Sequence, residues 1–148
     1  MVKDEPLNEI TLRRYEKPYQ ADKRELVKKV CLSLGLLQPG DSRDIVIDIL
    51  SVLLDARKNK EKLSSDDIKL RVENSRKEKN LELKGVAESN IRRQLKKLRD
   101  MMLVDKKENL YNLTEFESLS SIFENKVEKF LIGQATERIK EYLKAVEQ

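Results

Sequence analysis

The chain has 148 residues, of which 39% are hydrophobic and 39% are charged, and its formal net charge is +4. This composition suits one globular domain with an appendage and excludes a disordered chain. Histidine, the commonest general base and metal ligand, is absent. The sequence also holds no phosphate-binding glycine loop, dinucleotide fingerprint or zinc motif. We therefore expect no cofactor, no metal and no enzymatic activity. A hydrolase with paired carboxylates stays open, although the acids alternate with bases as on a solvated surface.

The single cysteine and the polar start of the chain bear on its compartment. Cys31 lies in an apolar helical segment and is expected to be buried. One cysteine cannot form an internal disulfide, which favours a reducing, cytoplasmic location. The start MVKDEPLNEI is not typical of a signal peptide, and no apolar run approaches the roughly 18 residues of a membrane span.

The positive charge is concentrated in the middle of the chain. Residues 57–107 hold 17 basic and 9 acidic side chains, a net charge of +8, whereas residues 1–56 and 108–148 carry −1 and −3. Such a field favours a polyanionic partner. The alternative is a lysine-rich surface that is merely solvated.

Residues 1–57 predict an arm followed by two helices. Prolines at positions 6 and 18 discourage a helix in residues 1–21, where basic and aromatic residues mix. This arm could lie on nucleic acid, pack across a subunit, or be a plain terminal tail. Residues 22–36 predict a helix capped by Asp22, and residues 42–57 predict a central core helix capped by Asp41 or Ser42.

A third helix is expected to open at Leu63–Ile68. Ser64 and Asp67 have the spacing of a capping box. The basic residues that follow, beginning at Arg76, are expected to be exposed. Leu81–Leu83 alternates in polarity and predicts a short strand that pairs with a later hairpin.

Residues 85–113 predict an amphipathic helix and then a small hairpin. Glu88-Ser89-Asn90 has the composition of a helix cap, and Ile91, Leu95, Leu98 and Met102 share one helical face. Leu103-Val104 and Leu110–Leu113 would pair across the charged tip 105–109, with Asn109 in a turn of positive φ.

The opposite face of this helix is the candidate site. At 100° per residue, polar and basic side chains point away from the buried face. Arginine and asparagine can contact base edges, and serine, lysine and a helix N-terminus can hold phosphates. The candidate DNA-binding residues are Ser89, Asn90, Arg92, Arg93, Lys96 and Lys97 on the helix, with Lys106 and Lys107 at the hairpin tip. The alternative is an ordinary solvated helix face.

The last segment, residues 114–148, predicts a helix too long for one small domain to cover. Gly133 is expected to mark a bend or a close helix crossing. Pairing with a second copy would bury the apolar stripe, so we expect a homodimer, whereas the alternative is a helix folded back on its own domain. The predicted dimer-interface residues are Phe116, Leu119, Phe123, Val127, Phe130, Leu131, Ile139, Tyr142 and Leu143.

The segments Leu63–Ile68, Gly85–Leu95 and Leu98–Thr114 together resemble winged helix-turn-helix DNA-binding proteins of the transcriptional-regulator type. The likeness covers residues 42–114 and departs at 74–84, where the connection is longer than usual. It implies a mainly α fold: a winged helix-turn-helix domain with a small β-hairpin wing and a long C-terminal helix.

The resemblance also divides the chain and suggests a function. The divisions would be an arm (1–21), the winged-helix domain with an extra N-terminal helix (22–113) and a dimerisation helix (114–148). The implied function is a homodimeric transcriptional regulator that binds double-stranded DNA. The alternative is a protein–protein interaction module in a transcription, replication or chromosome-segregation complex, since fold does not decide function.

Overall fold

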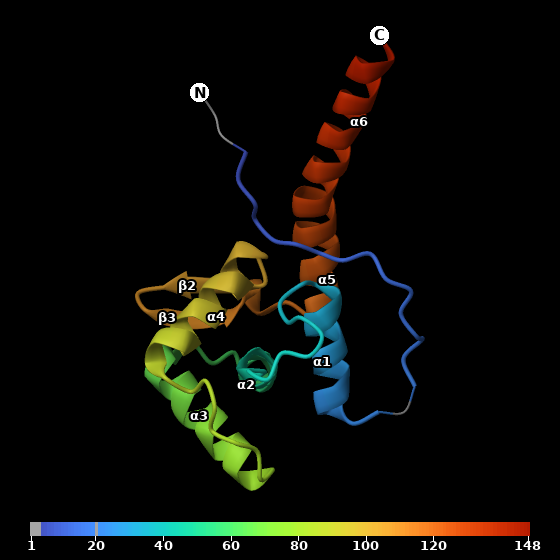
Figure 1. Ribbon diagram of the computed structural model, residues 1–148. Helices are drawn as coiled ribbons and strands as arrows, with labels where there is room; N and C mark the ends of the chain where they lie inside the picture. Colours follow the sequence, from blue (N-terminus) through green and yellow to red (C-terminus); the bar gives the residue numbers. More distant parts are fainter. Residues whose placement is uncertain (1–3, 20) are drawn as a thin grey trace.

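The computed structural model describes residues 4–19 and 21–148, a mainly helical chain with a small three-stranded antiparallel sheet (Figure 1). The helices are α1 (Lys23–Ser33), α2 (Ile45–Lys58), α3 (Ser65–Glu78), α4 (Glu88–Asp100), α5 (Leu119–Ile122) and α6 (Gly133–Glu147). A 3₁₀ turn, η1 (Thr114–Phe116), and a π-helical stretch, η2 (Phe123–Ile132), complete the helical segments. The strands are β1 (Leu63–Ser64), β2 (Val104–Lys107) and β3 (Leu110–Leu113). Within the described residues, no helix is long and apolar enough to cross a membrane.

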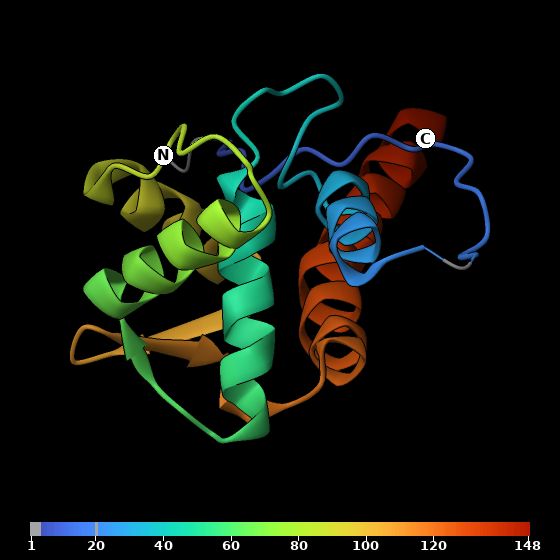
Figure 2. The same cartoon turned by 90° about the horizontal axis from the view of Figure 1, so that it is seen from below.

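Helix α2 is the centre of the fold, as its apolar stripe predicts. Nine of its residues are buried, and the helix packs against α1, α3, α4 and β3. Figure 2 shows α2 between α3, α4 and the sheet on one side and α1 with the terminal helix on the other. The helix begins one turn later than expected. Its N-cap is Asp44, whose side chain makes no cap hydrogen bond, and not Asp41 or Ser42.

Two other predicted caps are confirmed. The Asp22 side chain accepts a hydrogen bond from Glu25 N at 2.8 Å and begins α1. Ser64 and Asp67 form the reciprocal capping box of α3, with N–O distances of 3.1 and 3.2 Å. Each cap satisfies backbone N–H groups that the first helical turn leaves without a partner.

The sheet has the order β1-β3-β2. The hairpin pairs Val104 with Leu113 and Lys107 with Leu110, which leaves a two-residue turn. Glu108 and Asn109 in that turn have φ of 52° and 64°, the left-handed pair that a tight hairpin requires, so the prediction for Asn109 is confirmed.

The predicted strand at Leu81–Leu83 is wrong. These residues form no strand, and β1 takes the third place in the sheet by pairing Leu63 with Tyr111. Residues 79–87 instead form an irregular connection between α3 and α4. The connection is held by Arg76, whose Nε donates to Glu82 O at 2.6 Å.

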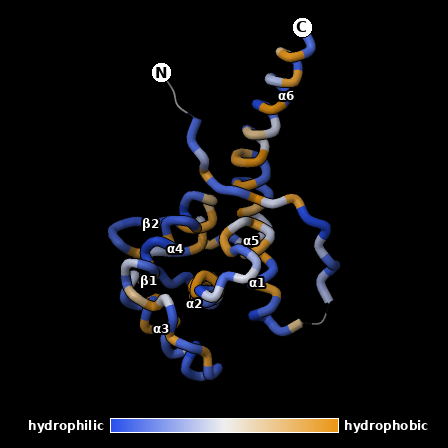
Figure 3. Tube along the Cα trace, viewed as in Figure 1, coloured by the Kyte–Doolittle hydropathy of each residue, from blue (hydrophilic) through white to orange (hydrophobic). Residues whose placement is uncertain are grey.

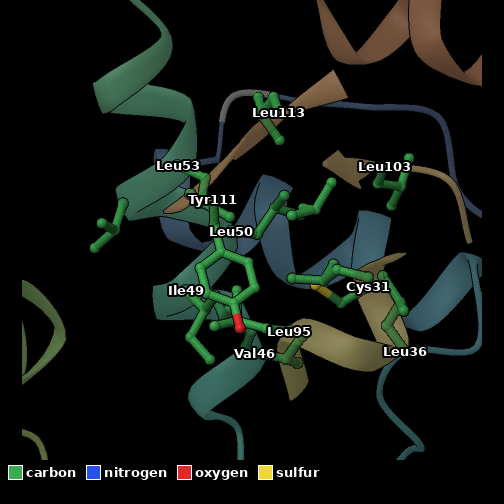
Figure 4. Packing of buried hydrophobic residues seen from close by; sticks show 14 of the residues in the cluster. Cys31, Leu36, Val46, Ile49, Leu50, Leu53, Leu95, Leu103, Tyr111 and Leu113 are labelled. Atoms are coloured by element: carbon green, nitrogen blue, oxygen red, sulfur yellow. The ribbon is translucent and has the colours of Figure 1, made fainter. Parts of the chain in front are cut away.

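The hydrophobic core joins residues from helices and sheet (Figure 4). Cys31 is fully buried in it, and this burial raises the pKa of its thiol to about 12, as expected for an inert cysteine. Ile122 and Val127 of the C-terminal segment belong to the same core, with Leu119, Phe123 and Leu131 packed against it.

The C-terminal segment therefore divides into two parts, and the predicted dimer interface is wrong for the first part. Leu119, Phe123, Val127 and Leu131 cover their own domain, and the half-buried Phe116 accepts a hydrogen bond from Arg57 at its carbonyl oxygen. No bend occurs at Gly133, whose φ and ψ of −59° and −45° are helical. Helix α6 extends beyond the domain with no buried residue, and apolar and polar segments alternate along it (Figure 3).

Candidate nucleic-acid interface

Helix α4 has one face in the core and one in solvent. Ile91, Leu95 and Leu98 are fully buried, as their spacing predicts, whereas Met102 lies past the helix end and is half-buried. Of the predicted contacts, Ser89, Arg92, Arg93, Lys96 and Lys97 are exposed, and Arg99 and Asp100 of the same helix are exposed as well. Five of the six helical candidates therefore share a solvent-facing surface, which we call the α4 cationic face.

Asn90 is the exception, and its prediction as an outward residue is wrong. Its side chain is only 7% exposed and points toward the start of the helix. Nδ2 donates to Gly85 O at 2.7 Å, and Oδ1 accepts from Gln94 Nε2 at 3.2 Å. Asn90 therefore anchors the turn before α4. The cap prediction is wrong as well, since the N-cap is Ala87, which offers no side-chain hydrogen bond.

Two of the four cationic side chains on this face are paired with acids on the same helix. Arg92 Nη2 lies 2.7 Å from Glu88 Oε1, and Lys96 Nζ lies 3.2 Å from Asp100 Oδ2. Exposed pairs of this kind contribute little to stability, so a phosphate can replace the acid. Arg93 and Lys97 make no ion pair within the described part of the chain. They are the cations most available to an anionic partner.

The two hairpin lysines lie on β2 and not at the tip. Lys106 stands opposite Tyr111 with Nζ 5.7 Å from the centroid of the ring, and Lys107 stands opposite Leu110. Successive side chains of a strand point to opposite faces, so these two exposed lysines face different ways. The tip predicted to carry them is formed by Glu108 and Asn109.

The most polar site in the interior is one that the sequence did not predict. Arg24, Asp44, Asp48 and Arg76 form a network of ion pairs between α1, α2 and α3. Burial by itself lowers the pKa of Arg24, but the hydrogen bonds and charges of Asp48 and Asp44 outweigh it and raise that pKa. Arg76 is 4% exposed, so the expectation of an exposed basic tail is wrong at its first residue. An aspartate inside the apolar run of α2 was the available signal. The network has two bases and two acids, so its charge is balanced and it joins elements of the fold.

Comparisons of the chain with protein-family models, with curated proteins and with solved structures each found no match. A proposal about function therefore rests on the α4 cationic face, the hairpin beside it and the exposed stripe of α6.

Proposed function

We propose that residues 45–113 form a winged helix that binds double-stranded DNA, and that the protein is a homodimeric transcriptional regulator. The order α2, β1, α3, α4, β2, β3, with β1 completing the sheet beside the hairpin, supports a winged helix. One observation carries the proposal: a helix whose inner face is fully buried presents four cationic side chains and Ser89 to solvent on its outer face.

Helix α4 suits a major groove in size and chemistry. Its 13 residues span about 20 Å at about 1.5 Å per residue, and a major groove about 12 Å wide admits a helix. Arg93, at the centre of the exposed face, is placed to contact a guanine edge. Lys97 and Ser89, at either end, are placed to hold phosphates and fix the register of the helix.

The hairpin supplies a second contact. Strand β2 follows α4 directly and packs against it, so Lys106 and Lys107 lie on an element fixed to the proposed recognition helix. Since the two lysines face opposite sides, one of them would reach the DNA backbone while the other stays in solvent.

The dimer is proposed to form through α6. Ile139 and Val146 of α6 continue a seven-residue repeat that begins at Ile132, the last residue of η2, and Tyr142 and Leu143 lie between them. This is the spacing of a two-helix seam. Exposures of 59% for Ile139, 65% for Tyr142 and 83% for Val146 leave this stripe uncovered in one chain. Pairing with a second copy would bury it and hold two α4 cationic faces at a fixed spacing.

The test is a titration of duplex DNA against increasing salt, with single substitutions on α4. We expect Lys97→Ala to make the slope of log affinity against log salt shallower by about 0.9, the value for one neutralised phosphate. We expect Arg93→Ala to weaken binding about tenfold and to relax sequence preference at one position. The double substitution of Lys28 and Lys29 by alanine removes two exposed charges from α1 and serves as the control.

Absence of duplex binding at low salt, or binding that both α4 substitutions leave unchanged, would overturn the proposal. In that event, the α4 cationic face would be better explained as a surface for an acidic protein partner.

A further inference from the structure

The N-terminal arm is seated on the fold at the junction of α1 and α4. Asn8 Nδ2 donates to Leu34 O at 2.7 Å, just past α1, and to Met101 Sδ at 3.0 Å, just past α4. In Figure 1, the arm runs past the C-terminal end of α4 and on toward the far side of α1. Pro6–Glu9 of the arm therefore lie beside the C-terminal end of α4, where they line a hollow together with Lys97.

The absence of a side chain at Gly35 makes room for the backbone of the arm. A Cβ built on this glycine would lie 2.0 Å from the carbonyl oxygen of Glu9 and 3.3 Å from Asn8 Nδ2. The φ of Gly35 is +73°, which side-chain-bearing residues rarely adopt. A residue without a side chain thus ends α1 and at the same time admits the arm backbone.

The charges of the docked segment oppose those of α4. Residues 4–10 hold Asp4, Glu5 and Glu9 and no base, whereas Glu88–Asp100 holds five bases and two acids. Pro6–Glu9 and Lys97 line the same hollow of about 310 Å³, together with Gly35, Gln38 and Asp100. Of the arm's own bases, Lys3 comes directly before this segment and those at positions 13, 14 and 17 come after it. An acidic stretch of the arm therefore leads into the hollow that Lys97 of α4 lines.

We propose that arm residues 4–10 act as an acidic cover that competes with DNA for the C-terminal end of the α4 cationic face. This inference rests on the proposed function and adds a regulatory step to it. Phosphates that approach Lys97 would meet the carboxylates of the docked arm, which repel them within a Debye length of about 10 Å at 0.1 M salt. Two side-chain hydrogen bonds from Asn8 hold the segment, so binding of DNA can displace it without unfolding the domain.

The first test removes the acidic charges of the arm and keeps the Asn8 hydrogen bonds that hold it. The triple substitution Asp4→Asn, Glu5→Gln and Glu9→Gln is compared with Glu137→Gln, Glu141→Gln and Glu147→Gln, which removes three exposed acids from α6. Both proteins have the same net charge. With a mixed-sequence duplex, we expect the arm variant to bind about fivefold tighter than the control at about 50 mM salt, and the advantage to shrink toward 200 mM because salt screens the repulsion.

The second test releases the arm. Asn8→Ala removes the hydrogen bonds to Leu34 and Met101 and should also tighten duplex binding. Asn125→Ala, which removes one exposed side-chain hydrogen bond to Ser121, is its control. Equal affinities of the arm variants and their controls would overturn the inference alone. Absence of duplex binding in the parent and in every variant would overturn the proposed function and this inference together.

Discussion

Arg76 and Asp48 form a buried ion pair between α3 and α2, with Nη1 of the arginine 2.6 Å from Oδ2 of the aspartate. Only 4% and 1% of the two side chains are exposed. Asp44 accepts from the same Nη1 at 3.1 Å, and Arg24 on α1 donates to both aspartates. One network thus fixes α1, α2, α3 and the connection that leads to α4.

Substitution of the buried Arg76 should therefore lower the stability of the fold. We expect Arg76→Met to lower the free energy of unfolding by about 3–5 kcal/mol, because it removes one partner of a buried pair. Urea denaturation measures the loss. Arg71→Met on the same helix removes an exposed pair with Glu61 and should cost much less. Equal losses in the two variants would contradict the structural role of the network.

The buried thiol of Cys31 predicts a loss of stability at alkaline pH. Burial raises its pKa from 9.0 to about 12, while the nearby Arg24 charge opposes the shift. Below pH 9 the thiol is protonated in both the folded and the unfolded state. As pH rises from about 9 to about 12, only the unfolded chain releases the proton. Stability should therefore fall by up to about 1.4 kcal/mol per pH unit.

The measurement is the free energy of unfolding against pH for the parent and for Cys31→Ala. The variant is less stable throughout because it leaves a cavity, so the slope between pH 9 and 12 is the informative quantity. A parent slope no steeper than that of Cys31→Ala would show that the thiol does not titrate as its burial requires.

Asn90 and Arg93 lie three positions apart on α4 and should have opposite phenotypes. Asn90→Ala removes the bonds to Gly85 and Gln94, so we expect a loss of about 1–2 kcal/mol in unfolding free energy. Its DNA affinity, measured on the folded protein, should match the parent. Arg93→Ala should weaken DNA binding and leave the unfolding free energy near that of the parent. If Asn90→Ala weakened DNA binding and Arg93→Ala lowered only stability, the proposed contact surface on the outer face of α4 would be wrong.

Assembly through α6 is tested by one apolar substitution. We expect Ile139→Asp to convert a dimer into a monomer in light scattering, because it places a charge in the middle of the exposed stripe. Lys140→Asp, at the adjacent position on the polar side, should remain dimeric. A chain ending at Ile132 keeps the buried Ile122 and Val127 and should be a folded monomer. A parent protein that is itself monomeric at micromolar concentration would remove α6 from the proposed dimer.

Local features of this chain could be predicted from its sequence, and pairings between distant segments could not. The Ser64–Asp67 capping box and the turn at Asn109 depend on residues within a few positions, and both are as predicted. The strand assigned to Leu81–Leu83 is wrong because β1, earlier in the chain, already pairs with β3. Arg76 is buried because it pairs with Asp44 and Asp48, some 30 residues earlier in the chain. Asp48 in its apolar run indicates a buried charge, but no local pattern identifies Arg76 as its partner.

Part of the candidate site could likewise be predicted from the sequence, and part of it could not. Helical periodicity correctly predicted which residues form the exposed face of α4, because the buried Ile91, Leu95 and Leu98 define the opposite face of the helix. It failed for Asn90, which lies at the flank between the two faces, where a contact with the preceding turn decides the outcome. It also treated the terminal apolar stripe as continuous, although half of that stripe covers the chain's own core.

Glu115 and Phe116, with φ of 53° and 55°, set the direction in which the chain leaves the sheet for its last helix. Left-handed geometry is unfavourable for such side chains, and the bond from Arg57 to the Phe116 carbonyl oxygen helps to hold the turn. In the proposed assembly, this two-residue joint would determine how far apart the two recognition helices stand. Glycine at position 115 would accept the same backbone angles while loosening the joint, so such a protein would tolerate a wider range of distances between operator half-sites than the parent.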